Sequence, residues 1–97
     1  MSLSVPEIIS QSKILFSNLG IPNAYLFGSY AKGIQTESSD IDFVIYLGYK
    51  KLPLSALFKI ADAKETLEST FNKEVDLIVS PSEEFYEKIK NHVIRII

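Results

Sequence analysis

Residues 41–47 constrain the fold of this 97-residue chain most strongly, because they form an apolar run that ends at Gly48. Beyond Asp42 both alternating sets of side chains are apolar, which is typical of a central strand covered by helices. Two carboxylates, Asp40 and Asp42, stand at the start of this run. Alternation along a strand points them to the same side of the sheet, where like charges repel unless a cation lies between them. The pair therefore indicates a divalent metal ion.

A small-residue turn precedes these carboxylates. Residues 24–27 predict a short strand that runs directly into Gly28 and Ser29. Residues 30–32 can form one helical turn before Gly33, and the unpaired N–H groups at a helix start attract phosphate oxygens. We interpret Gly28 and Ser29 as a phosphate-binding turn; the alternative is an ordinary tight turn after a strand.

The remaining segments alternate between helical and strand patterns. Ser4, Pro6 and Glu7 indicate a helix start, and Gly20 with Pro22 indicates its end. A helix is predicted by the stripe of Leu57, Ile60, Ala61, Lys64, Leu67 and Phe71, and a strand is predicted over residues 75–79. The start signal over residues 80–83 and a stripe from Phe85 to Ile96 predict a last helix. The order predicts one α/β (α+β) domain over residues 1–97, with a small mixed sheet flanked by helices.

Asp76 is a lone carboxylate among aliphatic residues of the predicted strand 75–79. The helix before it is long enough for a parallel crossover from strand 41–47. If these strands are neighbours, Asp40, Asp42 and Asp76 meet at one end of the sheet. The alternative is an edge-strand aspartate paired with Lys73 or Lys90. Three carboxylates beside a phosphate turn suit magnesium-assisted nucleotidyl transfer.

Composition excludes several other classes of protein. The formal net charge of -2 argues against extended nucleic-acid binding, although a nucleotide remains possible with a metal ion. The chain has no cysteine, which removes disulfides and thiolate chemistry and favours the cytoplasm. The N-terminal residues have neither a basic start nor a long apolar run, so we expect no secretion signal and no membrane insertion.

The spacing of these motifs resembles the minimal nucleotidyltransferases of the DNA polymerase beta superfamily. Their signature is a Gly-Ser pair, about ten residues, Asp-x-Asp and a later strand aspartate, matched here by Gly28-Ser29, Asp40-Ile41-Asp42 and Asp76. The resemblance implies that Gly28 and Ser29 bind the triphosphate. Lys32 stands where many relatives have a basic residue, which implies that it also binds the nucleotide. The resemblance also implies that Asp40 and Asp42 ligate two magnesium ions. Asp76 would complete one metal site and assist deprotonation of the acceptor.

The small size of the chain resembles the MNT antitoxins, which work beside a helical HEPN toxin. In that family the antitoxin can transfer AMP from ATP to a tyrosine of the toxin, a ribonuclease, and for this chain the substrate would be ATP or another NTP. The resemblance implies the same role here, with a hetero-oligomer or homo-oligomer possible. Two alternatives stay open: a non-catalytic antitoxin of the same fold, or the catalytic subunit of a small-molecule (aminoglycoside-like) nucleotidyltransferase.

The apolar tail over residues 93–97 also has two interpretations. Four of its five residues are aliphatic, and a surface of that composition is unfavourable in water. The tail either closes the core of the domain or docks a partner helix.

Overall fold

The chain is built around a four-stranded mixed sheet in the order β3-β2-β1-β4. The structure, a computed structural model, describes residues 3–49, 51–80 and 84–97. Its elements in chain order are α1 (Val5–Asn18), β1 (Asn23–Phe27), α2 (Gly28–Lys32), β2 (Ile41–Tyr46), α3 (Leu54–Phe71), β3 (Val75–Val79), α4 (Glu84–Ile89), a 3-10 turn (Lys90–His92) and β4 (Ile94–Arg95). The predicted α/β class with a mixed sheet is confirmed.

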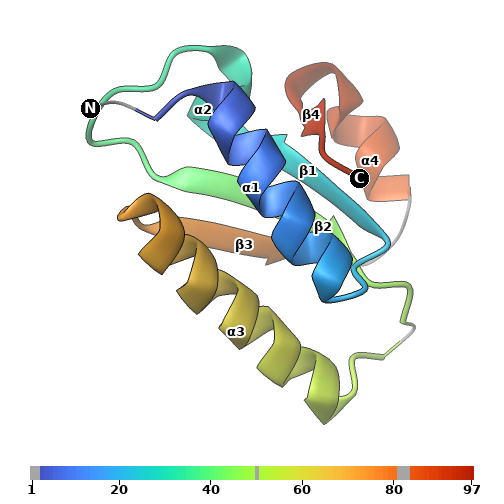
Figure 1. The fold of residues 1–97 in the computed structure, drawn as a ribbon. Coiled ribbons are helices and arrows are strands. Elements are labelled where there is room, and N and C mark those ends of the chain that lie inside the picture. Colours follow the sequence, from blue (N-terminus) through green and yellow to red (C-terminus); the bar gives the residue numbers. More distant parts are fainter. Residues whose placement is uncertain (1–2, 50, 81–83) are drawn as a thin grey trace.

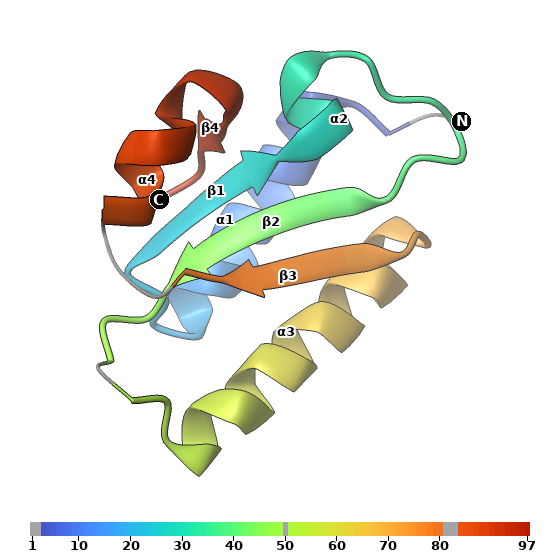
Figure 2. The ribbon, with the colours of Figure 1, turned by 180° about the vertical axis from the view of Figure 1, so that it is seen from behind.

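The helices are distributed unequally over the two faces of the sheet. Helices α1 and α3 lie side by side on one face, in front of the sheet in Figure 1 and behind it in Figure 2. Helix α4 lies near β1 and β4, on the opposite face (Figure 2). We call the face turned away from α1 and α3 the outer face; its β2–β3 half is left open by the helices (Figure 2).

Local signals set the ends of the first helices as predicted. The Ser4 hydroxyl accepts the N–H of Glu7 at 3.2 Å and donates to the Glu7 carboxylate at 2.9 Å, a reciprocal cap at the start of α1. Helix α2 begins at Gly28 and ends at Lys32, and the next residue, Gly33, has a φ of +72°, the left-handed conformation that glycine adopts readily. These residues fix where β1 turns into α2.

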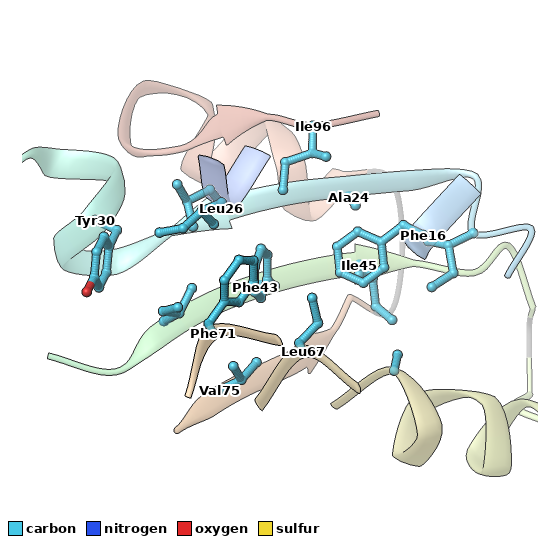
Figure 3. Close-up of a cluster of buried hydrophobic side chains, with 14 residues drawn as sticks. Phe16, Ala24, Leu26, Tyr30, Phe43, Ile45, Leu67, Phe71, Val75 and Ile96 are labelled. Carbon is cyan, nitrogen blue, oxygen red and sulfur yellow. The ribbon is translucent and has the colours of Figure 1, made fainter. Parts of the chain in front are cut away.

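The core fills the space between the sheet and helices α1 and α3. Phe16 from α1 and Phe43 from β2 meet edge to face, with ring centroids 5.5 Å apart, and Leu67 from α3 lies in the same buried cluster (Figure 3). Ser12 is buried within α1, but its hydroxyl donates to the carbonyl of Ile8 at 2.6 Å and is therefore satisfied. Residues 41, 43 and 45 of β2 are all buried, which anchors the central strand.

The predicted parallel crossover is confirmed. Strand β2 pairs with β3 in parallel, and α3 connects the two across the inner face of the sheet. The helix carries Ala63, Leu67 and Phe71 into the core, whereas Leu57 and Ala61, which the sequence pattern placed in the apolar stripe, are exposed. The helix was thus predicted correctly, but its buried face was predicted only in part.

The prediction of one long last helix through Ile96 is wrong. Helix α4 ends at Ile89, and the chain then returns as β4, antiparallel to β1. The N–H of Ile96 donates to the carbonyl of Ala24 at 2.8 Å, and the N–H of Ala24 donates to the carbonyl of Ile97 at 3.4 Å. Backbone groups along β1 need such partners, and β-branched residues suit a strand. The predicted start of this helix falls on residues 81–83, outside the described residues.

The tail therefore closes the core, the first of its two interpretations. Ile96 is 5% exposed and belongs to the main buried cluster (Figure 3). No helix among the described residues has the length and apolar character needed to cross a membrane.

Candidate active site

The predicted site residues converge where β1 ends and β2 and β3 begin. Strand β1 is antiparallel to β2, and β3 is parallel to β2. The last residues of β1 therefore lie at the same end of the sheet as the first residues of β2 and β3. Phe27 pairs with Asp42, and Asp42 pairs with Asp76. Gly28 follows Phe27 directly, so Asp42 lies between Gly28 on the β1 side and Asp76 on the β3 side.

Asp42 and Asp76 form a carboxylate pair on the outer face. Paired residues of neighbouring strands are about 5 Å apart and share a face. Burial of Asp42 raises the pKa of its carboxyl, and the charge of Asp76, a hydrogen bond with the Asp76 side chain and the charge of Asp40 raise it further. Two neighbouring carboxyl groups of this kind suit a metal cation, because a cation would stabilise the ionised form of both.

Asp40 occupies a different position from the other two aspartates. It lies one residue before β2 and is exposed, so it belongs to the end of the loop rather than to the strand. Within the described parts of the chain, no group of three histidine, cysteine, aspartate or glutamate side chains stands ready to hold a metal ion. The structure thus presents a contacting pair, Asp42 and Asp76, with Asp40 acting on Asp42 through its charge.

Gly28 approaches the carboxylate of Asp42 more closely than any other residue type could. Its φ is +69°, and a Cβ atom built there would overlap Oδ2 of Asp42 and lie 3.1 Å from its Cγ. The start of α2 is therefore pressed against the carboxylate pair. Ser29, half-buried, is the next residue of α2, while Lys32 is exposed in the last turn of the helix.

The family of the chain follows from a match that covers most of its length. The family model described as Polymerase beta, Nucleotidyltransferase matches residues 7–96. The chain belongs to this nucleotidyltransferase family. The predicted fold and the predicted enzyme class are both confirmed at this level.

Within the family, the nucleotidyltransferase is similar to proteins named as protein adenylyltransferases. It is 39% identical to a candidate protein adenylyltransferase of Methanocaldococcus jannaschii over 59 residues, which are 61% of this chain but only 59% of the relative. It is 29% identical to the protein adenylyltransferase MntA of Thermococcus cleftensis over 75 residues, 77% of this chain and 72% of the relative. The match thus spans less than two thirds of the Methanocaldococcus protein.

A solved structure shares the fold of this nucleotidyltransferase. The crystal structure of a toxin-antitoxin with AMP-PNP superposes with a TM-score of 0.66 at 25% identity, covering 90% of this chain and 72% of that chain. The resemblance to minimal nucleotidyltransferases of toxin-antitoxin pairs, stated from the motif spacing and the small size of the chain, is thereby confirmed.

Lys73, predicted above only as an alternative partner of Asp76, supports the loop before the site. Its ammonium group instead donates to the carbonyl oxygens of Glu37 and, at 3.1 Å, of Ser39. These bonds tie the turn after α3 to the loop that ends just before Asp40. No sequence signal marks this role, because the contact joins segments 34 and 36 residues apart.

A cavity of about 760 Å³ lies beside the same loop, lined by Leu3, Tyr30, Gln35, Thr36, Glu37, Phe71, Asn72 and Lys73. Tyr30 and Phe71 belong to the core, so the cavity is on the side of the sheet that α1 and α3 cover. Oε1 of Gln35 is buried and has no hydrogen-bond partner among the described residues. None of the three aspartates lines this cavity, which is therefore separate from the carboxylate pair.

Proposed function

We propose that this chain is a magnesium-dependent nucleotidyltransferase that moves AMP from ATP to a tyrosine hydroxyl of a HEPN-type toxin and thereby acts as its antitoxin. The register of Asp42 with Asp76, with Gly28 pressed against Asp42, is the observation that carries the proposal. The turn at Gly28, which would bind phosphate, and the carboxylate pair then lie at one end of the sheet.

Each predicted residue has a role in this proposal. Gly28 and Ser29 bind the triphosphate through backbone N–H groups and the serine hydroxyl, and exposed Lys32 adds positive charge nearby. Asp40, Asp42 and Asp76 are the residues that would hold magnesium. The donor set fits, since Asp42 and Asp76 are paired across neighbouring strands and a cation between them would offset the repulsion of their charges. Bound magnesium would offset the phosphate charge and lower the pKa of the acceptor hydroxyl.

The reaction balances with these groups alone. The acceptor oxygen attacks the α-phosphorus, and the bond from that phosphorus to the bridging oxygen of the β-phosphate breaks. Pyrophosphate leaves from the Gly28 side, and the acceptor proton passes to the carboxylate of Asp76. Asp76 is exposed, so an acceptor on another molecule can reach it.

Two relatives support the choice of acceptor. One carries the name protein adenylyltransferase MntA, and one solved structure is a toxin-antitoxin with AMP-PNP. Both fit transfer of AMP to a protein better than transfer to a small molecule.

The proposal is tested by incubating the chain with magnesium, a HEPN-type toxin and ATP labelled at either the α- or the γ-phosphate. We expect label on the toxin from α-labelled ATP only, because the γ-phosphate leaves with pyrophosphate. Asp42→Asn should lower the transfer rate about 100-fold or more. A toxin that stays unlabelled while its ribonuclease activity is blocked would instead identify a non-catalytic antitoxin.

A further inference from the structure

The outer face carries an apolar row directly behind the carboxylates. Strand pairing aligns Tyr25, Val44 and Ile78 across β1, β2 and β3, two residues along from the row of Phe27, Asp42 and Asp76. Val44 is 1% exposed and Tyr25 is 6% exposed, whereas Ile78 is 41% exposed. Ile78 is thus the accessible apolar end of this row.

Ile78 and Asp76 share the open half of the outer face. They are two residues apart on β3, so their side chains point the same way, about 7 Å apart along the strand. Strand β3 is at the edge of the sheet, and α3 covers only its inner face (Figures 1 and 2). An exposed isoleucine is ordinary by itself. Its place beside Asp76 is what gives it a role.

The direction of attack follows from the order of groups across the sheet. In phosphoryl and nucleotidyl transfer the attacking and leaving oxygens lie in line, on opposite sides of the phosphorus. If Gly28 and Ser29 hold the leaving phosphates on the β1 side of Asp42, the acceptor must arrive from the β3 side. That approach crosses Asp76 and runs along Ile78.

We infer that Ile78 is an acceptor-positioning residue, whose side chain packs against the apolar body of the acceptor side chain while the acceptor hydroxyl reaches Asp76. The inference rests on the proposed function. It assigns Ile78 to acceptor recognition only, so nucleotide binding does not depend on it.

Ile14 provides a matched control. It is also an isoleucine and is 59% exposed, but it lies on α1, on the opposite side of the sheet. Ile78→Thr and Ile14→Thr both keep a β-branched side chain and lose the same apolar group, so backbone preference changes little in either variant.

The experiment measures steady-state AMP transfer to a HEPN-type toxin, with toxin and ATP varied separately. For Ile78→Thr we expect the KM for the toxin to rise about tenfold, with kcat and the KM for ATP within about twofold of wild type. Ile78→Val should restore most of the loss, and Ile14→Thr should match wild type.

An unchanged toxin KM in Ile78→Thr would overturn the inference and leave the proposed function standing, as would an equal rise in Ile14→Thr. A fall in kcat or in ATP affinity alone would also overturn it, since it would place Ile78 on the nucleotide side. If the wild-type chain transfers no AMP, the proposed function fails and the inference fails with it.

Discussion

At Gly28 the backbone passes so close to Asp42 that any β-carbon would overlap the carboxylate. This single contact connects the turn to the aspartates. The spacing of Gly28, Ser29, Asp40 and Asp42 could be recognised in the sequence because all four lie within one short segment of the chain. The contact itself could not, because it depends on the antiparallel register of β1 and β2.

We predict that Gly28→Ala is more damaging than Gly33→Ala. Both glycines have a φ near +70°, so alanine should lower the free energy of unfolding by about 1 kcal/mol at either position. At Gly28 the overlap with Asp42 should add about 1–3 kcal/mol, whereas a β-carbon at Gly33 meets nothing within 4 Å. Urea denaturation of both variants measures the difference, and equal losses would contradict the close approach.

Asp42 gives a prediction about pH. Its carboxyl has a pKa above the ordinary value of 3.8, chiefly through burial, so ionisation destabilises the folded state. The penalty is full above the raised pKa and disappears as the pH falls toward 3.8. Without metal at pH 7, Asp42→Asn should therefore be more stable than wild type, by less than about 1 kcal/mol because water screens a half-buried site.

Thermal melting in a chelator across the acid range measures this difference. The advantage of Asp42→Asn should shrink as the pH is lowered through the raised pKa. A variant that is less stable than wild type at pH 7 would show that the carboxylate is stabilised in the fold, and would count against a cation-ready pair.

At the scale of elements, the sequence predicted the helix ends and strands that depend on contacts between residues close together in the chain. The cap at Ser4, the helical turn before Gly33 and the apolar run of β2 all appear in the structure as expected. Strand β4 was missed because its sequence also suits a helical stripe. What decides between the two is pairing with β1, about 70 residues earlier, and such long-range contacts leave no local pattern.

The tail at the C-terminal end of the described chain gives an element-scale prediction. Ile96 is buried in the core beside β1, so Ile96→Ala should lower the free energy of unfolding by about 2–4 kcal/mol. Ile14→Ala, on an exposed helix surface, should cost less than about 1 kcal/mol. If chemical denaturation found the two variants equally stable, the tail would not be part of the sheet.

At the scale of the whole molecule, the open half of the outer face leaves Asp76 accessible to a second molecule. The turn at Gly28 and the carboxylates of Asp42 and Asp76 suit a nucleotide and its metal ions, and the exposed side of β3 faces away from α1 and α3 (Figure 2). We therefore expect the acceptor hydroxyl to come from another molecule. The sequence predicted the carboxylates of this site, but the direction of approach emerges only from the strand order.

We propose that AMP transfer to a protein takes place at this end of the sheet. Its most direct test is the intact mass of a HEPN-type toxin after incubation with ATP, magnesium and the wild-type chain, Asp42→Asn or Asp76→Asn. We predict that the toxin gains the mass of one or more AMP groups with wild type and none with either folded variant. An unmodified toxin with the wild-type chain, or equal modification by Asp42→Asn, would contradict the claim.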